Sequence, residues 1–264
     1  MIPDLTDQPL RDLISLKGRA AVVTGGAKGL GAAIARRLAE AGASVLIGDI
    51  DEPGAKAMAD SLASSYNVNG IATELDVRDA SSIAAAAELA VGEFGRIDIW
   101  VNNAGVYPST PVLEMSDDEW DRVLATNLRG TFVGCREAGR RMIAAGTRGV
   151  IVNQSSIAGI RGRGPNVAHY VASKHGIIGV TRQLGLEFAP HGIRVLAIAP
   201  TTTITPGVEA ALGPQGDLET RLAGPLGRAA RPDDIARVVL FCASDMSLFM
   251  TASTLLVDAG EMAR

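Results

Sequence analysis

The sequence has few cysteines, few aromatic residues and no long apolar run. Cys135 and Cys242 are its only cysteines, which is too few for a disulfide framework or a zinc site, so a reducing cytoplasm is expected. No apolar stretch approaches the roughly 18 residues of a membrane span, and residues 1–17 lack a signal-peptide core. The net charge of −4 gives no reason to expect nucleic-acid binding. Neither a membrane nor a nucleic acid is therefore an expected partner, and no metal-ligand cluster with catalytic spacing is present.

The chain does have abundant apolar residues, 47% of the total, over a length of 264 residues. This length suits one large α/β domain. Short β-rich apolar runs alternate with helical patterns along it. The expected strands are 20–24, 44–49, 71–75, 97–101, 150–153, 193–198 and 254–257; the expected helices are 29–41, 53–64, 81–94, 170–188 and 232–243, with helical patterns from 116 to 145.

Strands that are apolar throughout and separated by helices predict a parallel sheet that is covered on both faces. Right-handed crossovers then give a single doubly wound Rossmann-type α/β domain with about seven strands. Ligands of such a fold bind at the carboxyl ends of the strands. Residues 1–18 are interpreted as a surface arm before the first strand.

A glycine-rich turn, Thr24–Gly31, closes the first expected strand and opens the first helix. Glycines here permit the tight turn and let a pyrophosphate approach the backbone at the helix N-terminus. The spacing is G-x-x-x-G-x-G, not the commoner G-x-G-x-x-G. A purely structural turn is the alternative, but the strand–turn–helix context favours nucleotide binding.

Asp49 ends the second expected strand. A carboxylate there can accept hydrogen bonds from both adenosine ribose hydroxyls and would repel a 2′-phosphate, so it favours NAD over NADP. Lys28 could pair with that phosphate, which would favour NADP. Asp51 is a less favoured candidate for the carboxylate that binds the ribose. The alternative for Asp49 is that it is a solvated residue at the end of the strand and binds no ligand.

Tyr170 and Lys174 are four residues apart, so they lie on the same side of a helix. A free tyrosine has a pKa of about 10, too high for a base at neutral pH. A neighbouring ammonium favours the phenolate and lowers that pKa. The pair is therefore expected to exchange a proton with an alcohol or carbonyl oxygen.

Four further motifs occur in a recognisable order: T-G-x-x-x-G-x-G at 24–31, Asp76-Val77, Asn102-Asn103-Ala104-Gly105, and Asn127 within Ala125–Leu128. With Tyr170 and Lys174, they make the chain resemble the short-chain dehydrogenase/reductase family over nearly its whole length. The resemblance implies a nicotinamide cofactor bound by Gly25, Lys28, Gly29, Leu30, Gly31, Asp49, Ile50, Asp76, Val77, Asn103, Ala104, Gly105, Tyr170, Lys174, Pro200, Thr203 and Thr205.

The resemblance also implies a catalytic tetrad of Asn127, Ser156, Tyr170 and Lys174. Tyr170 would exchange the proton, Ser156 would hold the substrate oxygen, Lys174 would bind the nicotinamide ribose, and Asn127 would support a water-linked proton route. The family's serine motif reads Ile151–Ser156 here, which favours Ser156 over Ser155. Its distance to the tyrosine is 14 residues where the family usually has 13, so the loop 157–169 is expected to carry one extra residue and to alter the substrate pocket.

Two segments depart from the family pattern. After the sixth strand, Thr201 and Thr203 stand where the family has a glycine and a hydrophobic residue, while Pro200 and Thr205 match. Near the C-terminus, Asp258-Ala259-Gly260 replaces the usual D-G-G. Thr203 can still make its backbone contact, and the Thr205 hydroxyl can still reach the carboxamide.

Three residues near Tyr170 each have a structural and a functional interpretation. His169 is interpreted as a helix-entry histidine, with substrate contact as the alternative. Arg161 and Arg163 could bind an anionic substrate, although a solvated loop is favoured. Cys135 and Trp100 are expected in the core. By resemblance, 206–226 forms a lid over the substrate, with mobility expected at 213–216.

The sequence thus predicts an NAD-dependent dehydrogenase for a secondary alcohol: a polyol, a sugar or a hydroxysteroid-like compound. The alternative within enzymes is an NADPH-dependent carbonyl or 3-oxoacyl thioester reductase, against which Asp49 argues. The alternative of another class is a nucleotide-sensing protein without catalysis. By resemblance, a homo-tetramer is expected, built around the helices that carry Asn127 and Tyr170.

Overall fold

The computed structural model describes residues 2–212 and 215–263. Its centre is a seven-stranded parallel sheet in the order β3-β2-β1-β4-β5-β6-β7. The order reverses between β1 and β4, where adjacent crossovers go to opposite sides and leave a crevice at the carboxyl ends. The strands are β1 (Ala20–Thr24), β2 (Ser44–Asp49), β3 (Gly70–Glu74), β4 (Ile99–Asn102), β5 (Val150–Gln154), β6 (Arg194–Pro200) and β7 (Thr254–Val257).

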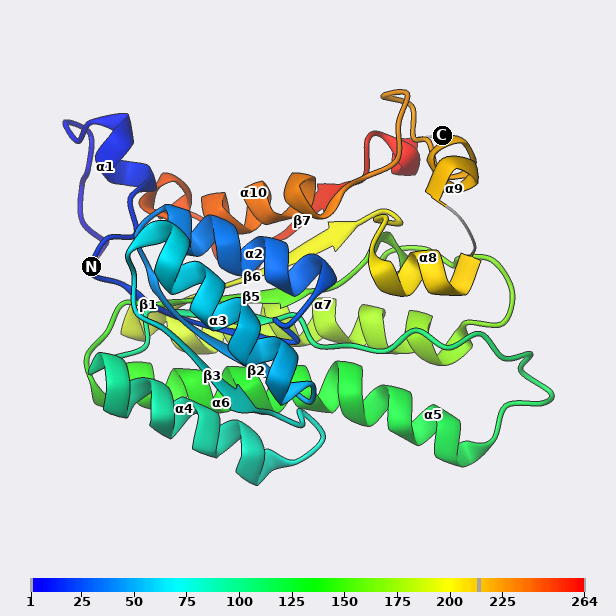
Figure 1. Ribbon diagram of the computed structural model, residues 1–264, viewed down its shortest axis with the longest axis horizontal. Coiled ribbons are helices and arrows are strands. Elements are labelled where there is room, and N and C mark those ends of the chain that lie inside the picture. The colour runs from blue at the N-terminus through cyan, green and yellow to red at the C-terminus, as the bar shows by residue number, and fades with distance from the viewer. Residues whose placement is uncertain (1, 213–214, 264) are drawn as a thin grey trace.

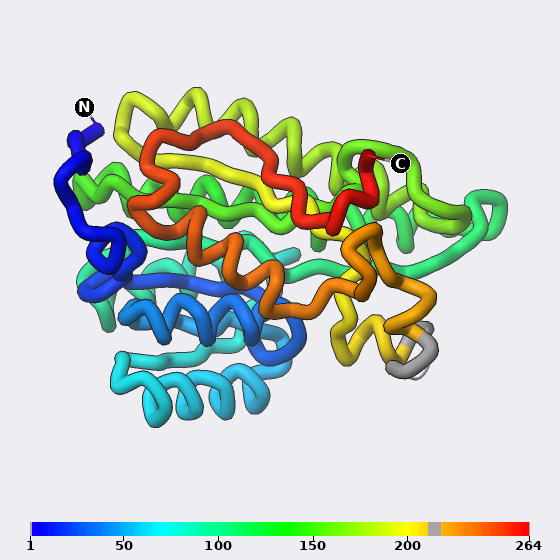
Figure 2. The backbone as a smooth tube through the Cα atoms, turned by 90° about the horizontal axis from the view of Figure 1, so that it is seen from above, coloured from blue at the N-terminus to red at the C-terminus, as the bar shows by residue number. Residues whose placement is uncertain are grey.

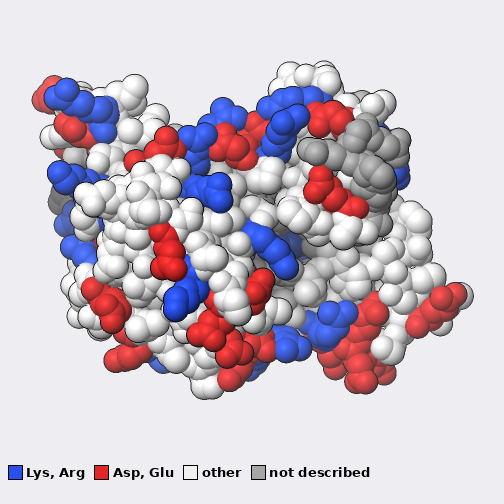
Figure 3. Space-filling view, viewed as in Figure 1, with Lys and Arg blue, Asp and Glu red and all other residues white. Residues whose placement is uncertain are grey.

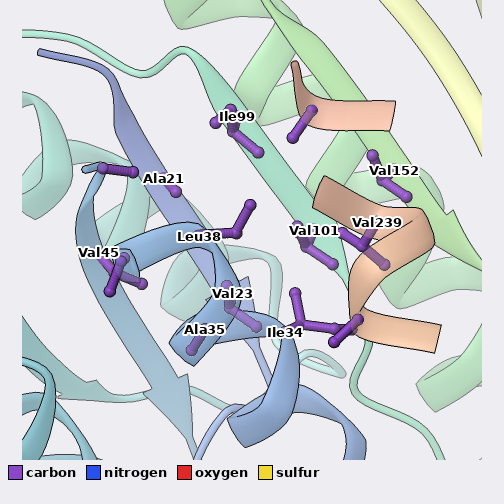
Figure 4. Close-up of a cluster of buried hydrophobic side chains, with 14 of the residues drawn as sticks. Ala21, Val23, Ile34, Ala35, Leu38, Val45, Ile99, Val101, Val152 and Val239 are labelled. Atoms are coloured by element: carbon purple, nitrogen blue, oxygen red, sulfur yellow. The ribbon is translucent and has the colours of Figure 1, made fainter. Parts of the chain in front are cut away.

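Helices cover both faces of the sheet (Figure 1). Helices α2 (Gly29–Glu40), α3 (Glu52–Tyr66) and α10 (Pro232–Ala243) pack on one face, and α4 (Ala80–Phe94), α6 (Gly130–Ala144) and α7 (Ala168–Phe188) pack on the other. Figure 4 shows Leu38 of α2 near Ala21 and Ile99 of the sheet, and Val239 of α10 beside Val101. Successive side chains of a strand point to opposite faces of the sheet, so they belong to different hydrophobic clusters. Val23 packs in the cluster under α2 and α10, whereas Val22 and Trp100 pack in the cluster on the other face.

The fold class and all seven expected strands are confirmed, with bounds that shift by one or two residues. The helical pattern from 116 to 145 is interrupted. It divides into α5 (Asp117–Leu124), a π-helical turn η1 (Ala125–Arg129) and α6. A wider turn of this kind is frequent at functional sites, and Asn127 lies in its middle.

The N-terminal segment is only partly the surface arm that the sequence predicts. It contains a short helix, α1 (Leu10–Ile14), without buried residues. Leu16, however, is fully buried, and its N–H donates to the carbonyl oxygen of Ala41 at 2.8 Å. The end of the arm is therefore part of the core beneath α2.

The segment expected to form a lid contains two short helices, α8 (Pro206–Leu212) and α9 (Gln215–Arg221), which lie beyond the carboxyl end of β6 (Figure 2). Leu218 of α9 packs against Ile204 and Ala229 in a small cluster of its own. Of the stretch 213–216 that the sequence predicts to be mobile, Gly213 and Pro214 lie outside the described residues. No helix in the described part of the chain is both long enough and apolar enough to cross a bilayer.

Candidate active site

A cavity of about 830 Å³ opens at the carboxyl ends of the strands. It runs from the glycine-rich turn after β1 to the start of α7, and it also contacts the start of α8. Figure 3 shows acidic and basic side chains interspersed over one face, with basic side chains at the hollow near its centre. All the residues predicted to bind the cofactor line this cavity: Gly25, Lys28, Gly29, Leu30, Gly31, Asp49, Ile50, Asp76, Val77, Asn103, Ala104, Gly105, Tyr170, Lys174, Pro200, Thr203 and Thr205.

Two glycines of the glycine-rich turn, Gly25 and Gly31, have no room for a side chain. A Cβ on Gly25 would lie 2.8 Å from the Cα of Ala104, and one on Gly31 would collide with the carbonyl oxygen of Gly25. Gly29 has φ +58°, in the left-handed region. The side-chain amide of Asn103 donates to the carbonyl oxygens of Thr24 and Gly25 at 2.9 Å and so fixes the turn. The cradle fits a pyrophosphate at the start of α2.

Two carboxylates lie at the other end of the cavity, after β2 and β3. Asp49 accepts hydrogen bonds from the N–H groups of Ala27 and Asp51, both at 3.0 Å. Asp76 is paired with Arg78 at 2.6 Å, and hydrogen bonds from that guanidinium lower the pKa of Asp76. Ile50, between the strand and Asp51, is 72% exposed and offers an apolar surface to a ligand.

Tyr170 and Lys174 face one another in the first turns of α7. The Lys174 Nζ atom lies 5.5 Å from the centre of the Tyr170 ring and donates to the carbonyl oxygen of Gln154 at 2.6 Å. Burial raises the pKa of Tyr170, although a hydrogen bond with Ser156 and the charge of Arg163 both act to lower it. The expectation that Lys174 lowers the pKa of Tyr170 is therefore not met in this structure.

Burial instead lowers the pKa of Lys174 itself, to about 8. The lysine is only 5% exposed and its ammonium group has lost most of its water. It can therefore exchange its proton near neutral pH.

This buried lysine leads to a testable pH dependence. The native state sheds the Lys174 proton near pH 8, whereas the unfolded chain keeps it until about pH 10.4. Because the unfolded state then binds more protons, wild-type stability should rise relative to Lys174→Met between these values. Urea unfolding of both proteins from neutral pH upwards measures this difference, and parallel stability curves would contradict it.

The two candidate serines have different surroundings. Ser155 is turned away from the cavity centre, because its hydroxyl donates to the carbonyl oxygen of Lys174 at 3.0 Å. The Ser156 Oγ accepts the N–H of Ala158 at 3.1 Å, and the Ser156 hydroxyl is close enough to Tyr170 to act on the pKa of the tyrosine. The structure thus brings Ser156, and not Ser155, to the tyrosine hydroxyl.

Asn127 is fixed by its neighbours and does not contact Lys174 in the described structure. Its Oδ1 accepts the N–H of Val106 at 2.8 Å, and its Nδ2 donates to the Val106 carbonyl oxygen and to the Ser173 hydroxyl. Since Ser173 is on α7 between Tyr170 and Lys174, Asn127 connects the π-helical turn to the helix that carries both residues.

The segment after β6 is tied to the C-terminus. The Thr201 hydroxyl donates to Glu261, whose other oxygen accepts from Arg161 at 2.9 Å. Arg161, for which the sequence favours a solvated loop, has a side chain that is 40% exposed and forms an ion pair with Glu261. Thr203 donates to the Thr201 carbonyl oxygen and pairs with Ala230, so both threonines that depart from the family pattern are held in place.

His169, which the sequence suggests for helix entry, is fully buried. Its Nδ1 accepts the N–H of Tyr170 at 2.8 Å, and its Nε2 lies 3.1 Å from Glu119 of α5. It therefore positions the tyrosine backbone. Cys135 and Trp100 lie in the core as predicted.

Sequence reasoning missed two site residues. Tyr107 packs edge-on against Tyr170, with ring centres 4.5 Å apart and an angle of 82°. Thr202 lines the cavity and accepts a hydrogen bond from Arg163. Tyr107 follows the Asn102–Gly105 motif by two residues, which is the signal that could have found it.

Comparison with known proteins gives consistent matches. A family model described as enoyl-(acyl carrier protein) reductase matches residues 25–261. D-threitol dehydrogenase of Mycolicibacterium smegmatis is 44% identical, over 93% of both chains. Cis-4-hydroxycyclohexanecarboxylate dehydrogenase of Sinomonas cyclohexanicum is 42% identical, over 93% of this chain and 97% of the relative. A short-chain type dehydrogenase/reductase from Mycobacterium marinum superposes with a TM-score of 0.88, at 32% identity over 96% of this chain and 99% of that chain.

Each of these proteins is a dehydrogenase or reductase by name, and the similarity extends over nearly the whole of this chain. The fold, the glycine-rich turn and the arrangement of Ser156, Tyr170 and Lys174 agree with that similarity. The chain belongs to the short-chain dehydrogenase/reductase family and is an alcohol dehydrogenase or ketoreductase that uses a nicotinamide cofactor.

Proposed function

We propose that the protein is an NAD-dependent dehydrogenase that interconverts a secondary alcohol and its ketone. The observation that carries this proposal is the cavity that Ser156, Tyr170 and Lys174 line together, with the Lys174 Nζ atom 5.5 Å from the centre of the Tyr170 ring. The relatives named above act, by name, on a polyol and on a cyclic hydroxy acid. A secondary alcohol of the polyol, sugar or hydroxysteroid-like kind is the substrate class that we propose to assay.

In the proposed mechanism, Tyr170 exchanges a proton with the substrate oxygen, and the Ser156 hydroxyl orients that oxygen. Lys174 is placed to hold the nicotinamide ribose and to pass on the tyrosine proton, since its own pKa is lowered to about 8. Asn127 holds the start of α7 through Ser173. The nicotinamide, when bound, accepts or supplies the hydride.

The assay that tests this function follows reduced-cofactor absorbance with NAD⁺ or NADP⁺ against polyols, sugars, secondary alcohols and hydroxysteroids. Turnover with NAD⁺ is the expected result. Efficient turnover with NADP⁺ alone would instead favour the NADPH-dependent reductase. Tight cofactor binding without turnover of any alcohol or ketone would contradict the proposal.

We also propose that the protein is a homo-tetramer. Two separate faces expose apolar side chains: a groove with Leu128 and Phe132 between η1, α6 and α7, and a second face with Leu186, Phe249 and Leu256 near β7. A tetramer with two-fold axes needs two such self-complementary surfaces on each chain. Phe132 is 42% exposed and Phe249 is 94% exposed, although both are large apolar residues.

Light scattering should therefore give four times the mass of the chain. Phe132→Asp should reduce the assembly to smaller species, because a carboxylate would be buried in the interface. Leu113→Asp is the control, since Leu113 is 96% exposed and does not line that groove. A wild-type protein that remains monomeric at micromolar concentration would refute the tetramer.

A further inference from the structure

The acidic residues that line the cavity are confined to one end of it, which also holds the basic residue Arg78. Its three acidic lining residues are Asp49, Asp51 and Asp76, which follow β2 and β3 at the end assigned to adenosine. Arg163 and Lys174 lie at the Tyr170 end. No aspartate or glutamate of the described chain lines the cavity there, so the substrate end is positively charged.

Arg163 differs from the neighbouring arginine. Arg161 is neutralised by Glu261 at 2.9 Å. Within the described ranges, Arg163 has no carboxylate at salt-bridge distance, and its one hydrogen bond runs from Nη2 to the hydroxyl of Thr202. A guanidinium has five N–H groups, so this single bond leaves one edge free for two parallel hydrogen bonds to an anion.

The loop that carries Arg163 is fixed on both sides of it. Arg161 is tied to the C-terminal Glu261, and the carbonyl oxygen of Asn166 accepts the N–H of Thr110 at 2.8 Å. Figure 2 shows the C-terminal end of the chain lying beside this loop. The guanidinium is therefore held at the cavity wall before a ligand arrives, which lowers the entropy cost of binding.

Arg163 is close enough to Tyr170 for its charge to oppose the rise in the tyrosine pKa. No hydrogen bond joins the two side chains in the described structure, so a group on Arg163 is distinct from the oxygen that reacts at Tyr170. Lys174 has another assignment in the proposed mechanism, where it holds the nicotinamide ribose, and one of its three N–H groups donates to the Gln154 carbonyl oxygen at 2.6 Å.

We propose that Arg163 binds a carboxylate of the substrate, so that the protein acts on hydroxy acids and their keto acids, with the carboxylate remote from the reacting carbon. A carboxylate carries one charge and matches one guanidinium edge, whereas a phosphate monoester carries nearly two charges and has three oxygens to satisfy. This inference rests on the proposed oxidoreductase function and adds the chemical class of the substrate.

The test measures reduction of 4-oxopentanoate, 5-oxohexanoate and 3-oxocyclohexanecarboxylate, each beside its methyl ester, with NADH and with NADPH. We expect kcat/KM for at least one acid to exceed that of its ester by about tenfold to a hundredfold, the range of a charge-assisted hydrogen bond. In Arg163→Met this preference should disappear, through a higher KM for the acid. The ester should lose much less kcat/KM than the acid, because it makes no charge-assisted hydrogen bond to the guanidinium.

Two variants serve as controls. Arg163→Lys keeps the charge but loses the two-pronged geometry, and should retain only part of the acid preference. Arg161→Met removes the neighbouring, already paired arginine and one anchor of the loop, and should lower the acid-to-ester ratio much less than Arg163→Met. A thermal melt of each variant checks that it is folded.

The outcomes separate this inference from the function on which it rests. Esters that react as well as acids, or an Arg163→Met variant that keeps the acid preference, would overturn the carboxylate site while the oxidoreductase stands. Failure of every acid and every ester with both cofactors, together with failure of every neutral alcohol in the assay above, would overturn both.

Discussion

Replacing Tyr170 with phenylalanine should lower kcat by about a hundredfold to ten-thousandfold, the usual contribution of a general acid–base group. The change removes only the hydroxyl, the group on whose pKa Ser156 acts. The ring keeps its edge-on contact with Tyr107, at 4.5 Å between ring centres, so the pocket should retain its shape. Steady-state kinetics and fluorescence titration with the reduced cofactor separate lost chemistry from lost binding.

Tyr107→Phe is the matched control, because it removes a hydroxyl from the other ring of the same pair. Its loss of kcat should be far smaller, since Tyr107 is 47% exposed and has no hydrogen bond with Ser156 in the described structure. Equal losses in the two variants would argue against proton exchange through Tyr170. Full activity of Tyr170→Phe would exclude the mechanism.

Replacing Asp49 with serine should shift the ratio of kcat/KM for NAD to that for NADP by about 100-fold towards NADP. Two like unit charges about 4 Å apart repel by about 4 kcal/mol at an effective dielectric constant of about 20, and solvent screening reduces this at a half-exposed site. The serine removes the repulsion of a 2′-phosphate, and Lys28, which lines the same cavity, can then pair with the phosphate. Kinetics with both cofactors on one substrate measure the ratio.

Asp51→Ser tests the alternative carboxylate. Asp51 is the N-cap of α3, where its Oδ1 accepts the N–H of Gly54 at 3.1 Å. Serine is also a good N-cap, so the fold should be retained and the cofactor ratio should stay as in wild type. A shift of the ratio with Asp51→Ser, and none with Asp49→Ser, would transfer the cofactor selection to Asp51.

Much of the site could be predicted because its motifs follow strand ends. Asp49 ends β2, Asp76 follows the end of β3 by two residues, and Asn103 comes directly after β4. The carboxyl ends of parallel strands meet at one edge of a sheet. The predicted residues therefore meet in one cavity although they are far apart in the sequence. Their roles in binding and catalysis remain predictions that the variants above test.

Other features depend on contacts that no local pattern contains. The long helical pattern around Asn127 gave no sign of the π-helical turn, because the turn is fixed by hydrogen bonds to Val106 and Ser173 in other segments. The sequence could not predict that Arg161 is paired with a carboxylate whereas Arg163 donates to a hydroxyl, because this difference depends on where Glu261 and Thr202 lie in the fold.

The sequence by itself determined the doubly wound sheet, the family and the order of the site residues, because apolar periodicity and motif spacing are local properties of the chain. The tertiary structure decided what each group experiences. Burial raised the pKa of Tyr170 and lowered that of Lys174, and hydrogen bonding turned Ser155 away from the tyrosine. The tertiary structure also left Arg163 without an ion-pair partner among the described residues. Solvation and pairing depend on distances between segments that only the folded chain brings together.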